Sequence, residues 1–440
     1  MKLIHIVGAR PQFVKMAVVS RAITVHNDRV AQGGRIEEMI VHTGQHYDEN
    51  MSAVFFEELE IPKPTYNLGI GSASQGAQTG RMLEAIEEVL AEEQPDWVIL
   101  YGDTNSTLAG ALAAAKLHIP VAHVEAGLRS FNRRMPEEIN RVLTDHASSL
   151  LFCPTETAVV NLRREGFTNI VNDGHLISDP DSDLALVMDH ELRTPNHEPV
   201  VLNIGDVMYD SVLYNLKLAE KRSDILKRLY LLPNKPHEPL PRAITTKTPI
   251  SRGNKLNELY ELNEPMRYAL ATVHRAENTD NPEHLRSIFQ ALDEIARSVM
   301  PVILPLHPRT REALGKVFSN CELRTLNSRL TIIDPVSYLD MLLLEKNAKL
   351  ILTDSGGVQK EAFMLDVPCV TLREETEWIE TVEAGWNVLV GADEARILEA
   401  VNRLSSQRSS DLQVNMYGDG HAAERIVNIL AKGITVGDNG

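Results

Sequence analysis

Cysteine is scarce in this chain of 440 residues, which contains three: Cys153, Cys321 and Cys369. They are scattered, and two of them lie within apolar runs of the kind that form strands. They therefore form neither the framework of a disulfide-stapled secreted domain nor the spacing of a metal site. We expect no bound metal, and this cysteine usage is typical of a protein from a reducing cytoplasm.

Long apolar runs are also missing from the sequence. No stretch approaches the ~20 apolar residues that a membrane-spanning helix needs. The first residues, Lys2 to Val7, have the pattern of a strand rather than that of a signal peptide. These absences predict a cytoplasmic protein that does not interact with a membrane.

Positive charge is in deficit, because 44 Lys and Arg face 61 Asp and Glu and leave a net charge of −17. Such an acidic chain is a poor partner for nucleic acid or an anionic membrane. A small anionic substrate can still bind where a few cations converge. No Gly-x-Gly-x-x-Gly follows a strand-like run and no Walker loop occurs, which argues against a nicotinamide cofactor and against a kinase. We expect no cofactor.

Apolar residues are plentiful, at 43% of the chain, and the length favours two cores. Strand-like and helix-like segments alternate through most of the sequence, which is typical of parallel α/β structure. Two stretches interrupt this alternation: residues 172–203 are polar and rich in Asp and His, and residues 233–255 are rich in Pro, Lys and Thr. Both are interpreted as surface insertions.

A strand-like run ends at Thr353, two glycines (Gly356 and Gly357) follow Ser355, and a helical pattern begins at Val358. We expect the glycines to allow a sharp turn, so that the free N–H groups of the helix start point at one spot that suits a phosphate. Glu361, nearly two turns into that helix, could accept hydrogen bonds from two sugar hydroxyls. The alternative is an ordinary strand-to-helix turn with Ser355 as its N-cap.

Carboxylates follow the strand candidates of the first half. Asp103 and Glu125 end consecutive strands, so parallel pairing would place both on the carboxyl edge of the sheet, where ligands bind. Glu137, at the next helix start, could join them. Three carboxylates in one cleft would raise one another's pKa, which suits general acid–base chemistry. Alternatively, Asp103 caps the helix that starts at Thr104, and Glu137 pairs with Arg141.

Cations and hydrogen-bond donors follow the strand candidates of the second half, and such groups fit a pyrophosphate. They are His274, Arg275, His307, Arg309 and Arg373. A single histidine at a strand end is more often structural than catalytic, but here two occur at adjacent edges, each with an arginine close behind. Arg10 and Lys15, just past the first strand, could also reach the phosphates. The two halves are thus chemically complementary.

Short motifs occur at residues 8–11 with Lys15, 43–46, 102–104, 124–129, 136–141, 205–210, 274–278 and 354–361. Together they resemble, in order and over nearly the whole chain, those of the non-hydrolysing UDP-N-acetylglucosamine 2-epimerases. The resemblance implies two Rossmann-like, doubly wound α/β domains facing across a cleft (the GT-B arrangement), usually in a homodimer. It places an N-terminal domain at residues 1–206, joined by a final helix at 420–433, and a UDP-binding domain at 207–419.

The resemblance also implies roles for the site residues. UDP would be held by Ser355, Gly356, Gly357 and, through the ribose hydroxyls, Glu361. The diphosphate would face Arg10, Lys15 and His274. The catalytic set would be Asp103, Glu125 and Glu137 around the sugar, with His274.

The C2 proton of an N-acetylhexosamine is not α to a carbonyl, so direct removal and return of this proton is implausible. Anti elimination of UDP across C1–C2 avoids that difficulty and leaves a 2-acetamidoglucal. UDP then adds back after a proton reaches C2 from the opposite face. This route needs carboxylates near C2, stabilisation of the departing diphosphate and a closed site.

The chain departs from the familiar family pattern at several places. Trp378 stands where an arginine is usual, which removes one cation from the UDP side. Tyr47-Asp48 and residues 69–76 replace the segments that form an allosteric site in regulated members, so we expect no such site here. Residues 130–135 and Trp378 also resemble relatives that act on UDP-2,3-diacetamido-2,3-dideoxy-glucuronate. Arg133 or Arg134 could bind the uronate, or both could be solvated loop charges.

The leading hypothesis is a cofactor-independent epimerase that interconverts UDP-GlcNAc and UDP-ManNAc for surface polysaccharide. The nearest alternative is the same reaction on the diacetamido-uronate. Two alternatives from other classes are a glycosyltransferase of the GT-B type and a nucleotide-sugar sensor without catalysis.

Overall fold

The computed structural model describes residues 1–44, 60–177, 198–229, 231, 267–318, 329–406 and 416–432. The chain divides into two compact units, of which the first comprises 1–214 with 414–440 and the second 215–413. The division falls inside helix α9 (Val207–Arg222). The boundary that we expected, between residues 206 and 207, is the start of this helix.

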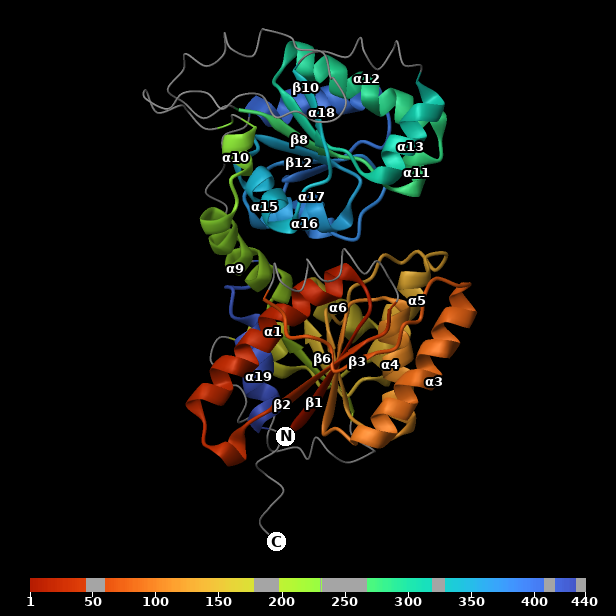
Figure 1. Ribbon diagram of the computed structural model, residues 1–440, viewed down its shortest axis with the longest axis vertical. Helices are drawn as coiled ribbons and strands as arrows, with labels where there is room; N and C mark the ends of the chain where they lie inside the picture. Colours follow the sequence, from red (N-terminus) through yellow and green to blue (C-terminus); the bar gives the residue numbers. More distant parts are fainter. Residues whose placement is uncertain are drawn as a thin grey trace. The chain divides into compact units, whose positions relative to one another are not determined.

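The first unit is built on a sheet of seven parallel strands in the order β3-β2-β1-β4-β5-β6-β7 (Figure 1). Its strands are β1 (Lys2–Val7), β2 (Glu37–His42), β3 (Tyr66–Asn67), β4 (Trp97–Tyr101), β5 (Val121–Val124), β6 (Leu150–Cys153) and β7 (Val200–Asn203). The central strands β4, β5 and β6 are buried along their whole length. Burial on both faces explains their continuous apolar sequences.

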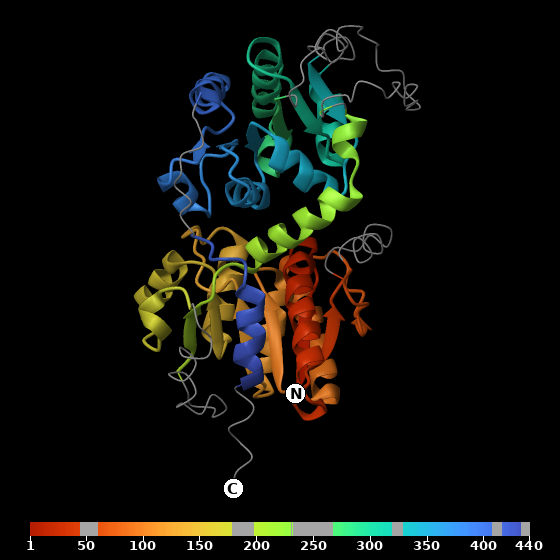
Figure 2. The same cartoon turned by 90° about the vertical axis from the view of Figure 1, so that its left-hand side faces the viewer.

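Helices connect these strands. They are α1 (Arg10–Arg29), α3 (Gln75–Glu93), α4 (Asn105–Lys116), α5 (Pro136–Ala147), α6 (Glu156–Arg164) and the C-terminal α19 (Ala422–Lys432), with short 3₁₀ turns at Gln32–Gly34 and Val171–Gly174. Figure 2 shows the red helix α1 and the blue helix α19 side by side, and their residues are in contact. The last helix therefore packs within the first unit.

The second unit has a sheet of six parallel strands in the order β10-β9-β8-β11-β12-β13. The strands are β8 (Ala269–Thr272), β9 (Val302–Pro305), β10 (Leu330–Ile333), β11 (Leu350–Thr353), β12 (Cys369–Thr371) and β13 (Asn387–Leu389). The helices are α10 (Ile225–Arg228), α11 (Ala276–Thr279), α12 (Pro282–Ser298), α13 (Pro308–Val317), α15 (Tyr338–Asn347), α16 (Gly356–Met364), α17 (Ile379–Glu383) and α18 (Glu394–Ser406).

Helix α12 shows why the sequence folds in this way. Asn281 accepts hydrogen bonds from two N–H groups of the first turn, Pro282 occupies the first helical position, and apolar residues then recur with helical spacing. Leu285, Ile288, Leu292 and Ile295 are fully buried against the sheet as part of the core of this unit. The opposite face is polar, as expected for a helix that covers one side of a sheet.

Both sheets have the strand order of a doubly wound fold, which confirms the predicted class of two Rossmann-like α/β domains. In such a sheet the order reverses between two neighbouring strands, and the loops that leave their carboxyl ends diverge there. The reversal lies between β1 and β4 in the first unit and between β8 and β11 in the second. Ligands of this fold class bind at these positions.

The polar insertion that we expected at 172–203 is shorter than predicted. Its first residues continue the 3₁₀ turn Val171–Gly174, and its last four form β7, which pairs with β6. The polar composition of the stretch hid this edge strand, whose own sequence is Val-Val-Leu-Asn. Residues 178–197, and the second expected insertion at 233–255, lie outside the described residues.

Asp210 attaches helix α9 to the C-terminal helix, because its carboxylate accepts a hydrogen bond from the N–H of Ala423 at 2.8 Å. Burial raises its pKa to about 6, and the charge of Asp206 adds to this effect. A carboxyl whose pKa is higher in the folded state stabilises the fold fully below its unfolded pKa, and loses this contribution as the pH rises through about 6.

We therefore expect Asp210→Asn, which keeps an acceptor oxygen without the charge, to raise the melting temperature at pH 8 by ~3 °C. At pH 5 the difference from wild type should largely vanish, because the native carboxyl is then mostly protonated. Differential scanning fluorimetry across this pH range measures the difference, with Glu424→Gln, at an exposed carboxylate of α19, as control. A constant difference at all pH values would contradict the titration.

Candidate active site

The loops that leave β1 and β4 are joined by Gln12, the third residue of α1. Its side-chain oxygen accepts hydrogen bonds from the N–H groups of Gly8 and Ala9, at 2.8 and 3.0 Å. Its side-chain nitrogen donates to the carbonyl of Tyr101 and the hydroxyl of Thr107. This buried glutamine therefore fixes both loops at the point where the strand order reverses, and nothing in the local sequence pattern indicated this role.

Glu125 follows β5 and lies at the same edge as Asp103, because β4 and β5 are parallel neighbours. Its carboxylate forms an ion pair with Lys15 of α1, and both side chains are nearly buried. Its φ of +71° is uncommon for a residue other than glycine. Gly102, with a φ of +64°, lies against this pair, since a Cβ there would be 3.3 Å from the Lys15 nitrogen and 3.4 Å from the Glu125 carboxylate.

Asp103 forms an ion pair with Arg141 of α5, and its side chain keeps 34% of its accessible surface. Arg141 is buried and also pairs with Glu138 at 3.1 Å. Asp103 and Glu125 therefore each have a cation beside them. From the sequence we had expected a group of carboxylates that repel one another. A partly exposed carboxylate held by a buried arginine is fixed in place and remains accessible to a ligand.

The two structural alternatives for these acids are wrong. Helix α4 is capped by Thr104, whose hydroxyl accepts the N–H of Thr107, so Asp103 is not the cap. The carboxylates that pair with Arg141 are those of Asp103 and Glu138 rather than that of Glu137. Glu137 lies exposed in the first turn of α5, one residue before the buried Glu138.

A buried network supports the loops that carry Asp103 and Glu125. His123 on β5 contacts the carboxylate of Asp145 at 2.7 Å with Nδ1 and donates from Nε2 to the carbonyl of Gly102 at 2.8 Å. Burial opposes the ionisation of Asp145, but His123 and Arg129 outweigh it and lower the pKa of this carboxyl. Sequence analysis missed this network, because its members look like ordinary residues of a strand and a helix.

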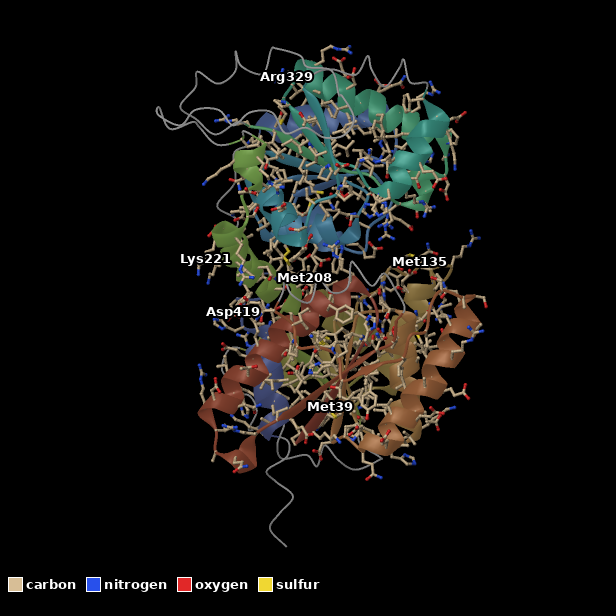
Figure 3. All side chains as sticks on the ribbon, in the orientation of Figure 1. Met39, Met135, Met208, Lys221, Arg329 and Asp419 are labelled. Carbon is tan, nitrogen blue, oxygen red and sulfur yellow. The ribbon has the colours of Figure 1, made fainter. Side chains whose placement is uncertain are left out.

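Glu138 organises the loop between β5 and α5. Its carboxylate accepts the N–H groups of Ser130 and Phe131, both at 2.9 Å. Arg133 and Arg134 follow in this loop and are exposed. Met135, which precedes α5, marks the place of the loop in Figure 3.

In the second unit, α16 begins at Gly356, two residues earlier than we predicted. Gly356 and Gly357 are its first helical residues and do not have positive φ, so the sharp turn that we expected from them is wrong. A Cβ at either would meet its nearest neighbour no closer than 3.5 Å. Neither position therefore requires glycine for the backbone conformation or for space.

Ser355 occupies the N-cap position of α16, but its side chain makes no capping hydrogen bond. The first N–H groups of a helix have no partner within the helix and carry a partial positive charge. Gly357 in the first turn is exposed, and N–H groups of this kind suit a ligand of the size and charge of a phosphate. This geometry favours the anion-binding interpretation over the simple cap.

Asp354 connects the two loops at the reversal point of the second sheet. It is fully buried, and its carboxylate accepts the N–H groups of His274 and Arg275, each at 3.0 Å, and the amide of Asn278 at 3.1 Å. The loop after β8 is thereby tied to the loop after β11. Sequence analysis gave Asp354 no role beyond its place in the motif.

His274 and His307 end neighbouring strands, as predicted, and their ring centroids are 5.4 Å apart. Burial lowers the pKa of both, and the arginine charges nearby lower them further. His307 accepts the N–H of Arg309 on Nδ1, so its neutral ring carries the proton on Nε2. Both rings are therefore neutral donors at pH 7, and a bound diphosphate would raise their pKa values.

Two of the predicted cations are already paired with carboxylates. Arg309 binds Asp280 at 2.7 Å, and Arg373 is buried against Glu377 at 3.3 Å. Trp378, the departure from the family pattern, donates its indole N–H to the carbonyl of Gly356 at 2.9 Å. It therefore supports the helix start where an arginine could have contacted a ligand.

Glu361 lies in the second turn of α16 and is nearly buried, with 6% of its surface exposed. The hydroxyl of Tyr338 donates to one of its carboxylate oxygens at 3.0 Å. Gln45 and His46, which the family motif includes, lie outside the described residues. In the described part of the chain, no helix has the length and apolarity needed to cross a membrane, and no three His, Cys, Asp or Glu side chains gather as a metal site would require.

Comparison with known proteins gives one family. Residues 28–237 and 244–431 match the model of the UDP-N-acetylglucosamine 2-epimerases. A protein of Methanococcus maripaludis called a UDP-N-acetylglucosamine 2-epimerase homolog is 48% identical over 98% of this chain and 99% of its own length. The UDP-2,3-diacetamido-2,3-dideoxy-D-glucuronate 2-epimerase of Pseudomonas aeruginosa is 45% identical over 98% of this chain and 100% of its own.

A solved structure gives the same result. The crystal structure of the Methanocaldococcus jannaschii UDP-GlcNAc 2-epimerase, in complex with UDP-GlcNAc and UDP, is 42% identical in sequence. It matches with a TM-score of 0.75 over 98% of this chain and 100% of that chain.

Proposed function

The chain belongs to the UDP-N-acetylglucosamine 2-epimerase family, and from this we propose that it interconverts UDP-GlcNAc and UDP-ManNAc by inverting C2 of the sugar. The observation that carries the proposal is the pair of acids at the carboxyl edge of the first sheet, next to the reversal point. Asp103 and Glu125 end neighbouring strands and are fixed by Arg141 and Lys15. In the second unit, the N–H groups of the first turn of α16 would bind UDP.

Proton transfer at C2 falls to Asp103 and Glu125, with Glu137 as the third acid of the set. A base removes the C2 proton while the C1–O bond to UDP breaks, which leaves a 2-acetamidoglucal. A proton delivered to C2 from the opposite face, with return of UDP to C1, completes the inversion. No redox step is involved, so the route requires no cofactor.

The departing diphosphate is bound by neutral and cationic donors. His274 and the N–H groups of the first turn of α16, beginning at Gly356, belong to the second unit, and Arg10 and Lys15 belong to α1. Lys15 also pairs with Glu125, so this cation lies beside one of the proposed proton-transfer groups. Electrostatic stabilisation of this kind supplies a large part of such barriers.

Glu361 binds the ribose in this proposal, since a carboxylate can accept hydrogen bonds from both hydroxyls. We expect Glu361→Ala to weaken UDP binding at least ~30-fold while the rate at saturating substrate falls less than about threefold. Isothermal titration calorimetry and steady-state kinetics measure the two effects. An unaltered dissociation constant would remove Glu361 from the ribose site. Glu312→Ala, at an exposed residue of the same unit, is the control.

The reaction itself is tested by hydrogen exchange at C2. The purified protein is incubated with UDP-GlcNAc in deuterated buffer and followed by NMR. Deuterium at C2 together with a UDP-ManNAc signal supports the proposal. A glycosyltransferase would need an acceptor and would leave C2 unlabelled, and a sensor would bind without any exchange.

A second substrate is favoured by specific observations. The relative that acts on the diacetamido-glucuronate is 45% identical, and Arg133 and Arg134 lie exposed in the loop before α5, on the same side of the sheet as Asp103. A uronate carries a carboxylate at C6 that such a cation would bind. Running the exchange experiment with both sugar nucleotides identifies the substrate as the one that gains deuterium faster.

We further propose that the protein acts in the cytoplasm as a homodimer. Ile139 and Leu143, one turn apart on α5, are 48% and 46% exposed, and Phe131 in the preceding loop is 65% exposed. Neighbouring exposed apolar side chains on a helix and the adjoining loop are typical of an interface. Light scattering should give twice the chain mass for the wild type and the monomer mass for Leu143→Glu. A wild-type monomer would refute this proposal.

A further inference from the structure

One ionisable side chain deep in the second unit takes no part in the site described above. Glu345, near the end of α15, is fully buried. Neither of its carboxyl oxygens has a hydrogen-bond partner among the described residues. An ionised carboxylate in that position would be costly. Burial raises the pKa of Glu345 well above its usual range and Glu361 raises it further, so the group is protonated at neutral pH.

The surroundings of Glu345 contain acidic and neutral groups. Glu361 faces it from α16, Cys369 from β12, and Tyr268 from the position just before β8. The pKa of the Cys369 thiol is raised to about 12, mainly by burial and in part by Glu345. Arg228 on α10, the other helix packed on α15, is paired with Asp340. Among the residues that the structure describes, none of the groups facing Glu345 is a cation.

Tyr338 lies seven residues before Glu345 and therefore on the same face of α15. It is the first residue of this helix, directly after the capping residue Ser337, whose hydroxyl accepts the N–H of Asp340. Its own hydroxyl donates to Glu361 at 3.0 Å, and only 7% of its surface is exposed. One face of α15 thus places the hydroxyl of Tyr338 and the carboxyl of Glu345 next to Glu361.

We propose that Tyr338 and Glu345 are positioning residues for ribose recognition by Glu361. Tyr338 fixes the direction of the Glu361 carboxylate, and the uncharged Glu345 leaves it as the one negative charge presented to the ribose hydroxyls. The inference rests on the proposed function for the contact between Glu361 and ribose. It adds that α15, which does not touch the nucleotide in this account, determines how strongly the hydroxyls are recognised.

The quantity that reports this role is the ratio of two dissociation constants, for 2′,3′-dideoxy-UDP and for UDP. Wild type should bind UDP at least ~10-fold more tightly, because the deoxy nucleotide leaves Glu361 without hydroxyl donors. Tyr338→Phe removes the hydrogen bond that orients Glu361 and should reduce the ratio below about threefold. The affinity for the dideoxy nucleotide should hardly change.

Tyr268→Phe is the matched control. Tyr268 is also a buried tyrosine of this unit next to Glu345, and its hydroxyl donates to the carbonyl of Leu344 at 2.7 Å without contacting Glu361. Its loss should lower the melting temperature and leave the ratio of dissociation constants as in wild type. A structural defect and a defect in ribose recognition are thereby separated.

The role of Glu345 is tested by Glu345→Gln, which is uncharged at every pH. At pH 7 its ratio should equal that of wild type. As the pH is raised, the wild-type ratio should fall once Glu345 ionises beside Glu361, while that of Glu345→Gln should stay higher. Ionisation of the uracil ring affects both proteins and both nucleotides equally, so it cancels in the comparison.

Calorimetric titrations of the four proteins decide the matter. Equal weakening of both nucleotides by Tyr338→Phe would make Tyr338 merely structural and overturn the inference. Identical pH profiles for wild type and Glu345→Gln would do the same for Glu345. If the wild type binds UDP and the dideoxy nucleotide equally well, Glu361 does not bind the ribose hydroxyls and the inference is overturned. The C2 exchange experiment would then show separately whether the protein is an epimerase.

Discussion

Asp103→Asn is expected to lower the rate of C2 exchange at least ~100-fold, while the dissociation constant of UDP changes less than about threefold. The substitution keeps the size of the side chain and one oxygen for Arg141, but it removes the charge and the capacity to carry a proton. Glu125→Gln should have a similar effect on the rate. Exchange measured by NMR at saturating substrate, together with calorimetric UDP binding, tests both variants.

The control for this experiment is Glu92→Gln, an exposed carboxylate of α3 in the same unit. It should leave both quantities unchanged. A large loss of UDP affinity in Asp103→Asn, with an unaltered rate at saturation, would contradict the assignment of Asp103 to proton transfer rather than to UDP binding. Retained exchange in both variants would exclude Asp103 and Glu125 as the groups that move the C2 proton.

Asp354→Ala is expected to destabilise the second unit by at least ~3 kcal/mol, because two backbone N–H groups and the buried amide of Asn278 lose a charged acceptor, which is itself fully buried. For a unit of this size the melting temperature should fall by ~10 °C. His274 would no longer be held against the start of α16, so UDP affinity should also fall at least ~10-fold. Scanning calorimetry and titration with UDP measure the two losses.

Two variants separate this effect from a general loss of charge. Asp354→Asn keeps one acceptor oxygen and should show a smaller loss of both stability and affinity. Asp334→Ala removes a carboxylate that is 77% exposed and pairs with Arg311 on the surface, so it should change the melting temperature by less than about 2 °C. Equal losses in Asp354→Ala and Asp334→Ala would show that Asp354 does not organise the site.

Local sequence patterns predicted the elements that carry the site with small errors at their ends. Val121–Val124 forms a strand with the predicted bounds, and α5 starts at Pro136 as expected. Apolar runs and helix-start residues depend on neighbours within a few positions, so a local pattern contains them. The error at Gly356 came from assigning glycine its commonest role, a positive φ, when here it is a helical residue without a positive φ.

Local sequence patterns could not predict the hydrogen-bond and ion-pair partners of the site residues. Gln12 binds the carbonyl of Tyr101 across 89 positions, and Asp354 binds the N–H of His274 across 80. Local periodicity has no information on pairs so far apart, because the strand order brings them together. The same reason explains why Arg141 pairs with Asp103 and Glu138 rather than with Glu137.

By itself, the sequence determined two doubly wound α/β domains, their family and the polar residues that follow each strand, because strand and helix periodicities and ordered motifs are properties of short segments. Only the tertiary structure decided which charge each acid faces, that α16 begins at its glycines, and that a buried uncharged glutamate lies beside Glu361. Those features depend on burial and on contacts between distant segments, which arise when the sheets assemble.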